Sequence, residues 1–242
     1  MLVCIDAGHA KNTAGKRSID STLREYEFNR AVAKLIRGQL ERHGVSVIYS
    51  CDLETPEDIS LTARSTTANK AKADIFVSIH ANAYGADWNS ANGWEIFYAA
   101  GSTKGHKLAQ VIHTESIPFL GLRDRGIKTA NFAVLTQTSM PAVLIEHGFY
   151  TNKDECAKLK DLEFRTKCAV ADTKGILAYL GIAWKEENEQ NEKTELETVE
   201  EIVDYLGQLG IITDPELWLK KLNEDRNAYW LARKCANHIK YH

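Results

Sequence analysis

Two histidines in this sequence lie at the carboxyl ends of short apolar segments. The apolar run 1–5 is followed by Asp6-Ala7-Gly8 and then His9, and the segment 74–80 is mostly apolar and ends at His80. Each run has the pattern of a short strand buried on both faces. Open α/β sheets bind their ligands at the carboxyl ends of such strands. A single histidine there is more often structural, but two of them predict a shared metal ion.

A catalytic zinc ion usually has three protein ligands and one open position, so the two histidines need a partner. Glu25, at the start of a predicted helix, is the best candidate. Alternatively, Glu25 binds no metal, and its charge only complements the helix dipole. Glu27 competes for the same role, but it lies about 200° further round the helix, so the two carboxylates cannot bind one metal. The sequence contains no HExxH motif.

A further carboxylate, Glu146, follows the apolar run 141–145. At a strand end beside a metal centre, it could take a proton from water and pass it to a leaving amine. Alternatively, it could pair with a loop arginine. His147 should point to the opposite side of an extended chain, and we interpret it as structural. No GxSxG motif supports a serine nucleophile.

The elements that must position these residues alternate between strand and helix patterns over residues 1–184. The predicted strands are 1–5, 45–49, 74–80, 93–98, 132–135 and 142–145; the predicted helices are 25–43, 59–72, 103–117 and 153–180. Residues 121–126, rich in glycine and charge, predict a loop. This alternation predicts an α/β fold, with a twisted, mostly parallel sheet and helices on both faces.

The composition changes after Trp184. Nine of the twenty residues from 185 to 204 are acidic, and 186–192 contains no apolar residue, which predicts an acidic linker over 185–195. Helical apolar spacing then returns and predicts a small helical module over 196–242. Its aromatic residues could bind wall carbohydrate or pack the helices, alone or against a partner chain in self-association; they are Trp218, Tyr229 and Trp230.

Composition excludes several classes of protein. The 242 residues are 44% hydrophobic and 26% charged, and no apolar run approaches the roughly 20 residues that a membrane span needs, so we expect no membrane insertion. A net charge of −3 gives no general attraction to nucleic acid. Five cysteines without a CxxC pair argue against a disulfide framework. No signal peptide is visible, so we expect synthesis in the cytoplasm.

Six sequence motifs occur in the order of a known family. They are IDAGH (5–9), REYEFN (24–29), LTARSTTAN (61–69), VSIHANA (77–83), the Arg-Gly of the loop 121–126, and PAVLIEHGFYTN (141–152). Over residues 1–182 the chain resembles the zinc-dependent N-acetylmuramoyl-L-alanine amidases of the Amidase_3 type. This resemblance implies a six-stranded sheet. It also implies hydrolysis of the peptidoglycan amide that joins the lactyl group of N-acetylmuramic acid to L-alanine of the peptide stem.

The resemblance also implies roles for individual residues. His9, Glu25 and His80 match the ligands of one zinc ion per chain, and Glu146 matches the catalytic glutamate that acts on a zinc-activated water. Asn82 and Asn131 are candidates for the substrate-binding groove. The sequence departs from the family after the first histidine, where Ala10-Lys11-Asn12 replaces the usual glycine-rich segment, as in some phage lysins.

The expected catalytic domain (1–184), linker and helical module together resemble a phage or prophage endolysin. Such an enzyme is made in the cytoplasm and acts at the cell wall after release, and the module would target it there. Three alternatives stay open: a cytoplasmic autolysin released by another route, a different zinc hydrolase of peptidoglycan (a peptidase or deacetylase), and a non-catalytic wall-binding protein.

Overall fold

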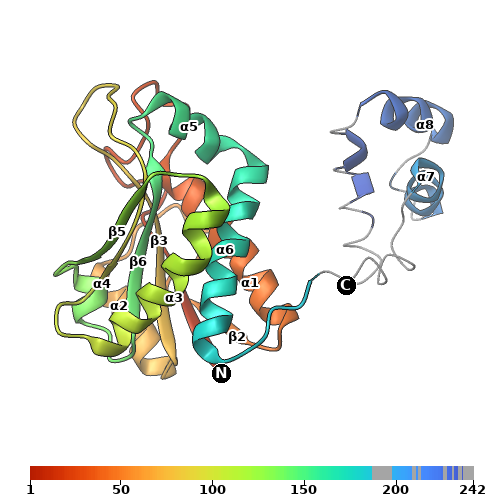
Figure 1. Cartoon of the computed structure of the whole chain (residues 1–242). Coiled ribbons are helices and arrows are strands. Elements are labelled where there is room, and N and C mark those ends of the chain that lie inside the picture. Colours follow the sequence, from red (N-terminus) through yellow and green to blue (C-terminus); the bar gives the residue numbers. More distant parts are fainter. Residues whose placement is uncertain are drawn as a thin grey trace. The chain divides into compact units, whose positions relative to one another are not determined.

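A six-stranded sheet runs through the first 184 residues of the computed structural model, with the strand order β2-β1-β3-β6-β4-β5 (Figure 1). The strands are β1 (Leu2–Ala7), β2 (Ser46–Tyr49), β3 (Ile75–Asn82), β4 (Trp94–Tyr98), β5 (Asp124–Thr129) and β6 (Ala142–Phe149). The adjacent strands β2, β1, β3 and β6 are parallel to one another, β4 is antiparallel to β6, and β5 is parallel to β4. The predicted mostly parallel, six-stranded sheet is therefore confirmed.

Helices cover both faces of this sheet (Figure 1). One face carries α1 (Glu25–Arg42), α3 (Thr103–Leu120) and α6 (Leu162–Leu180); the other carries α2 (Leu61–Ala71) and α4 (Ala133–Thr136), while α5 (Lys153–Lys160) precedes α6. Side chains alternate between the faces along each strand. Val3 and Val77 thus belong to the larger buried cluster, whereas their neighbours Cys4 and Phe76 belong to the smaller one. Both faces are buried, which explains the near-continuous apolar runs of the central strands.

Two predicted elements are wrong. Residues 132–135, predicted as a strand, form the start of the short helix α4, which begins at Ala133. A run of four apolar residues is too short for its periodicity to separate a strand from a buried helical turn. The predicted loop 121–126 is wrong in its second half, because residues 124–126 begin β5, which lies at the edge of the sheet and pairs with β4. Edge strands carry charged residues that discourage pairing with other chains, so their sequences look like loops.

The helical pattern predicted over 153–180 is divided into α5 and α6. Asp161 ends the first helix and caps the second, because its side chain accepts a hydrogen bond from the backbone N–H of Phe164 at 3.2 Å. Aspartate is a favoured N-cap residue, which explains a new helix at this position.

The chain divides into two compact units, Met1–Trp184 and Lys185–His242. The structure describes residues 1–186, 198–208, 211, 214–225, 228–230, 232–233 and 236. Most of the predicted linker therefore lies outside the described residues. Within the parts of the chain that are described, no helix is both long and apolar enough to cross a membrane.

The second unit contains α7 (Val199–Gln208) and α8 (Pro215–Glu224), which contact each other around a small buried cluster. The buried members of this cluster are Ile202, Val203, Leu206, Leu222 and Ala236. Trp218 and Tyr229 pack against it, whereas Trp230 is 43% exposed. Packing therefore accounts for two of the three aromatic residues singled out in the sequence.

A buried ion pair joins the first strand to α2. The Arg64 guanidinium donates to Asp6 Oδ1 at 2.7 Å, and both side chains are almost fully buried. The hydroxyls of Ser50 and Ser78 also donate to the Asp6 carboxylate. Burial by itself would raise the pKa of Asp6, but the Arg64 charge and these hydrogen bonds outweigh it and hold the pKa below its usual value.

We expect Asp6→Asn to lower the free energy of unfolding by about 3 kcal/mol at pH 7, because it breaks a buried ion pair. The loss stays near the lower end of the usual range because Asp58 still pairs with Arg64. Since the folded pKa of Asp6 is depressed, its contribution is complete above the unfolded value of about 3.9 and is lost as the pH falls through the lower folded value. Urea denaturation followed by circular dichroism from pH 7 to pH 3 measures both effects.

The exposed Asp87→Asn is the matched control for this experiment. As the pH falls from 7 to 3, the free energy of unfolding should decrease less in Asp6→Asn than in the wild type or the control. Identical pH profiles for all three proteins would contradict the assignment.

Candidate metal centre and catalytic carboxylate

His9, Glu25 and His80 come together from three elements of the fold. His9 follows β1, Glu25 begins α1, and His80 lies in β3, next to β1. The backbone N–H of Gly8 donates to the Ile79 carbonyl at 3.1 Å, which holds the two strand ends together. Glu25 Oε2 lies 3.4 Å from His9 Nε2, and Glu25 Oε1 lies 2.9 Å from His80 Nδ1. One ligand atom from each residue lies within 4.8 Å of the others.

The backbone around His9 is specialised for this approach. A Cβ atom at Gly8 would lie 2.1 Å from Cε1 of the His80 ring, so the position requires glycine. His9 itself has a φ of 62°, in the left-handed region, which costs a non-glycine residue about 1–2 kcal/mol. The Asn29 side chain donates to the Gly8 carbonyl at 2.8 Å and stabilises the turn from one side. Strain of this kind persists only where the surrounding contacts maintain it.

The structure separates Glu25 from its competitor Glu27. The Glu25 side chain is buried and also accepts a hydrogen bond from the backbone N–H of Ala81 at 3.3 Å. Glu27 is exposed and accepts the backbone N–H of Arg24 at 3.0 Å, so it caps the amino end of α1. Glu27 therefore serves the amino end of the helix, whereas the Glu25 carboxylate faces the two histidines.

The chemistry of these side chains fits a zinc ion. Glu25 Oε2 is buried and has no hydrogen-bond partner among the described residues, although it faces His9 and lies 4.0 Å from Lys16 Nζ. Burial lowers the pKa of His9 to about 4, which keeps its ring neutral at pH 7, as a metal ligand must be. Burial would raise the pKa of Glu25, but the hydrogen bond and charge of His80 outweigh it and keep the carboxylate ionised. Two imidazoles and one carboxylate form a typical catalytic zinc set.

Glu146 lies beside this centre. β6 is the neighbour of β3, and the strand register places Glu146 directly opposite His80. Its Oε2 is buried without a hydrogen-bond partner among the described residues. Burial raises the pKa of Glu146 to about 8; the charge of His80 acts against this rise and that of Glu25 adds to it. The geometry therefore puts an unpaired carboxyl group next to the three candidate ligands.

A pocket of about 290 Å³ opens over the centre. His9, His80 and Glu146 line it together with polar residues and an apolar wall, which include Lys16, Asp58, Leu61, Phe132 and Leu144. A substrate in this pocket would reach His9, His80 and Glu146 at the same time.

His147 points away from the pocket, as predicted. Its side chain is fully buried, and Nε2 lies 2.8 Å from Asp172 Oδ2 of α6. The sequence also allowed Glu146 to pair with an arginine of a loop, and no contact among the described residues supports this alternative. Arg125 pairs with Glu95 at 3.0 Å, and Lys128 pairs with the same carboxylate.

The two asparagines have different surroundings. Asn82 donates its side-chain N–H to Glu95 Oε1 at 2.6 Å, so its amide is already engaged by the protein. Asn131 is exposed and directly precedes Phe132, which lines the pocket. Their contact with substrate remains a prediction.

Sequence reasoning missed two groups of residues near the centre. Lys16 lies in the polar loop after His9, where no periodicity marks it. Arg64 and Asp58, which also line the pocket, are far from His9 in the sequence. The motif LTARSTTAN was the one available signal for Arg64, and it indicates no contact partner.

Comparison with known proteins gives a consistent set of relatives. Residues 3–178 match the model of the Amidase_3 family, described as N-acetylmuramoyl-L-alanine amidase. The amidase LytC of Bacillus subtilis is 37% identical over 179 residues, which cover 73% of this chain and 35% of LytC. The chain thus matches about a third of that relative. The endolysin of Bacillus phage SPP1 is 34% identical over 192 residues, which cover 76% of this chain and 68% of the endolysin.

Solved structures agree with these relatives. The catalytic domain of the amidase CwlV from Bacillus (Paenibacillus) polymyxa var. colistinus aligns with a TM-score of 0.70 at 35% identity, covering 75% of this chain and 99% of that domain. An N-acetylmuramoyl-L-alanine amidase from Clostridium difficile 630 aligns with a TM-score of 0.70 at 36% identity, covering 74% and 96%.

Proposed function

Because this chain belongs to the Amidase_3 family of N-acetylmuramoyl-L-alanine amidases, we propose that it is a zinc-dependent peptidoglycan hydrolase that cleaves the amide between N-acetylmuramic acid and L-alanine. One observation carries this proposal: His9, Glu25 and His80 converge within ligand distance of one another, and the unpaired carboxyl group of Glu146 lies beside them. We assign the first three as ligands of a single zinc ion and Glu146 as the catalytic glutamate.

Zinc held by these ligands would act as a Lewis acid, making a water acidic and stabilising the oxyanion that forms on the lactyl carbonyl. Glu146 takes the proton from the attacking water and transfers it to the leaving nitrogen of L-alanine. Without a metal ion, burial keeps Glu146 protonated near neutral pH. The double positive charge of a bound zinc ion would favour the ionised form of Glu146, which would then act as a base.

Product analysis tests the reaction. Mass spectrometry of digested peptidoglycan should find new amino-terminal L-alanine together with a free lactyl carboxyl group. A zinc peptidase would instead release termini within the peptide stem, and a deacetylase would release glucosamine amines. A non-catalytic wall-binding protein would leave the polymer intact. Any of these three results would contradict the proposal.

We further propose a phage or prophage endolysin, made in the cytoplasm and acting at the cell wall after release. The similarity to the SPP1 endolysin supports this assignment. The division into the units 1–184 and 185–242 supports the arrangement that we propose, a catalytic domain with an appended module. We assign the module of residues 196–242 to wall targeting, with self-association as the alternative.

A protein truncated after Trp184 should remain folded, bind zinc and cleave a soluble muropeptide at the full rate, because the first unit has its own core. On intact walls it should lose about 10-fold or more in rate, since a second binding site raises the local concentration of enzyme. Turbidity loss of wall suspensions, compared with muropeptide hydrolysis, measures the difference. If lysis of every wall type is unchanged while light scattering shows a smaller oligomer, the module is an assembly element.

A further inference from the structure

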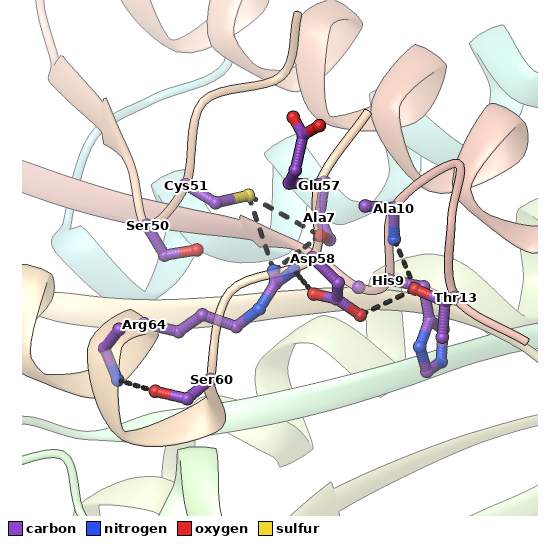
Figure 2. A network of polar contacts seen from close by, with 12 residues as sticks. Ala7, His9, Ala10, Thr13, Ser50, Cys51, Glu57, Asp58, Ser60 and Arg64 are labelled. Carbon is purple, nitrogen blue, oxygen red and sulfur yellow. Dashed lines mark hydrogen bonds and ion pairs between the residues drawn. The ribbon is translucent and has the colours of Figure 1, made fainter. Parts of the chain in front are cut away.

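A network of polar contacts connects Arg64 to the segment that carries His9 (Figure 2). The Arg64 side chain is only 2% exposed. One terminal nitrogen donates to Asp6 Oδ1 and to the Ala7 carbonyl, each at 2.7 Å, which fixes the guanidinium against β1. The other donates to Asp58 Oδ1 at 2.7 Å. Arg64 thus holds Asp58 in a fixed position relative to the strand that leads to His9.

The contacts continue from Asp58 to the residue after His9. Asp58 Oδ2 accepts the hydroxyl proton of Thr13 at 2.6 Å, and Thr13 Oγ1 accepts the backbone N–H of Ala10 at 2.9 Å. A threonine hydroxyl has a single proton. Since Thr13 gives that proton to Asp58, its lone pairs face Ala10, and each hydrogen bond has one possible direction. Figure 2 shows these residues forming a continuous chain beside His9.

Asn12 also attaches the same loop to the segment before α2. The backbone N–H of Asn12 donates to the Pro56 carbonyl at 3.1 Å, and the Asn12 side chain accepts the backbone N–H of Asp58 at 3.0 Å. The loop 10–13 is therefore held at Asn12 as well as at Thr13. His9, with its left-handed φ of 62°, lies directly before this held loop.

We infer that Thr13, Asp58 and Arg64 are positioning residues for His9, holding its backbone in the left-handed conformation that keeps Nε2 beside Glu25. This inference rests on the proposed zinc site. A ligand already held in its binding conformation loses less freedom when the metal binds, so the network should raise zinc affinity without contacting the ion.

The test is Thr13→Val, which removes the hydroxyl and preserves the shape of the side chain. We expect zinc binding, measured by competition with a chromophoric chelator, to weaken on the order of 10-fold. Thr13→Ser keeps the hydroxyl and should bind zinc as the wild type does. The control is Thr67→Val on α2, whose hydroxyl donates to the Ala63 carbonyl outside the network. The metal-free melting temperatures of Thr13→Val and Thr67→Val should agree.

A double-mutant cycle of Thr13→Val with Asp58→Ala should be non-additive, because both changes break the same chain of hydrogen bonds. The inference is overturned if Thr13→Val binds zinc as tightly as the wild type, if Thr13→Ser loses as much affinity as Thr13→Val, or if the melting temperature of Thr13→Val falls below that of the control. A wild-type protein that binds no zinc would refute the proposed metal centre instead, so the two failures can be told apart.

Discussion

Glu25→Gln is expected to lose zinc and to lower muropeptide hydrolysis to the rate of the metal-stripped protein. Glutamine is nearly the same size but lacks the negative charge, and Glu25 is the one anionic member of the proposed ligand set. Its two oxygens lie 3.4 Å from His9 Nε2 and 2.9 Å from His80 Nδ1, so the change affects the centre directly. His9→Ala and His80→Ala should have the same effect, as should chelation. Metal content per chain and hydrolysis rate, measured on the same preparation, check the result.

Glu27→Gln is the matched control, because the same change occurs two residues further along the same helix. Glu27 is exposed and caps α1 through the Arg24 N–H, so the variant should keep both its zinc and its rate. Its cost should be limited to about 0.3–1 kcal/mol of stability, because glutamine can still accept the Arg24 N–H and only the negative charge at the helix amino end is lost. The proposed centre would be wrong if a fully metal-free protein retained most of its activity, or if Glu25→Gln retained a full complement of zinc.

The positions of His9 and His80 could be predicted because they depend on a simple property of parallel sheets. His9 follows β1 and His80 lies near the carboxyl end of β3, and these two strands are neighbours that run in the same direction. The third candidate ligand was harder to predict. Helix geometry shows that Glu25 and Glu27 cannot both face the metal, but it does not choose between them. The choice depends on which side of α1 packs on the sheet, and therefore on tertiary contacts.

The wall of the pocket could not be predicted for a related reason. Phe132 lines the pocket from the start of α4, in the segment predicted as a strand. Four apolar residues fit either structure when considered alone, and the packing of α4 with α2 determines which forms. The contacts among Thr13, Asp58 and Arg64 could not be predicted either, because hydrophobic periodicity predicts which faces of an element are buried and not which polar groups form hydrogen bonds.

The proposed catalytic residue differs from the ligands in one measurable way. Glu146→Gln should keep about one zinc ion per chain while the hydrolysis rate falls on the order of 10²-fold or more, the usual scale for an acid–base group. Glutamine cannot take a proton from water or return one to the leaving nitrogen. The side chain of Glu146 lies beside His80 and has no hydrogen-bond partner for Oε2 among the described residues, so the substitution removes chemistry without breaking a structural contact that the structure records there.

Comparing Glu146→Gln with Glu25→Gln separates a role in proton transfer from a role in metal binding. Both variants replace a carboxyl group next to the proposed centre with an amide, so a general effect of this replacement would change zinc content in both proteins. A role limited to proton transfer requires zinc to be lost in Glu25→Gln and retained in Glu146→Gln. Glu163→Gln, an exposed carboxylate of α6, should change neither quantity. If Glu146→Gln loses its metal, then Glu146 is a ligand, and the proton must be transferred by another group that faces the pocket.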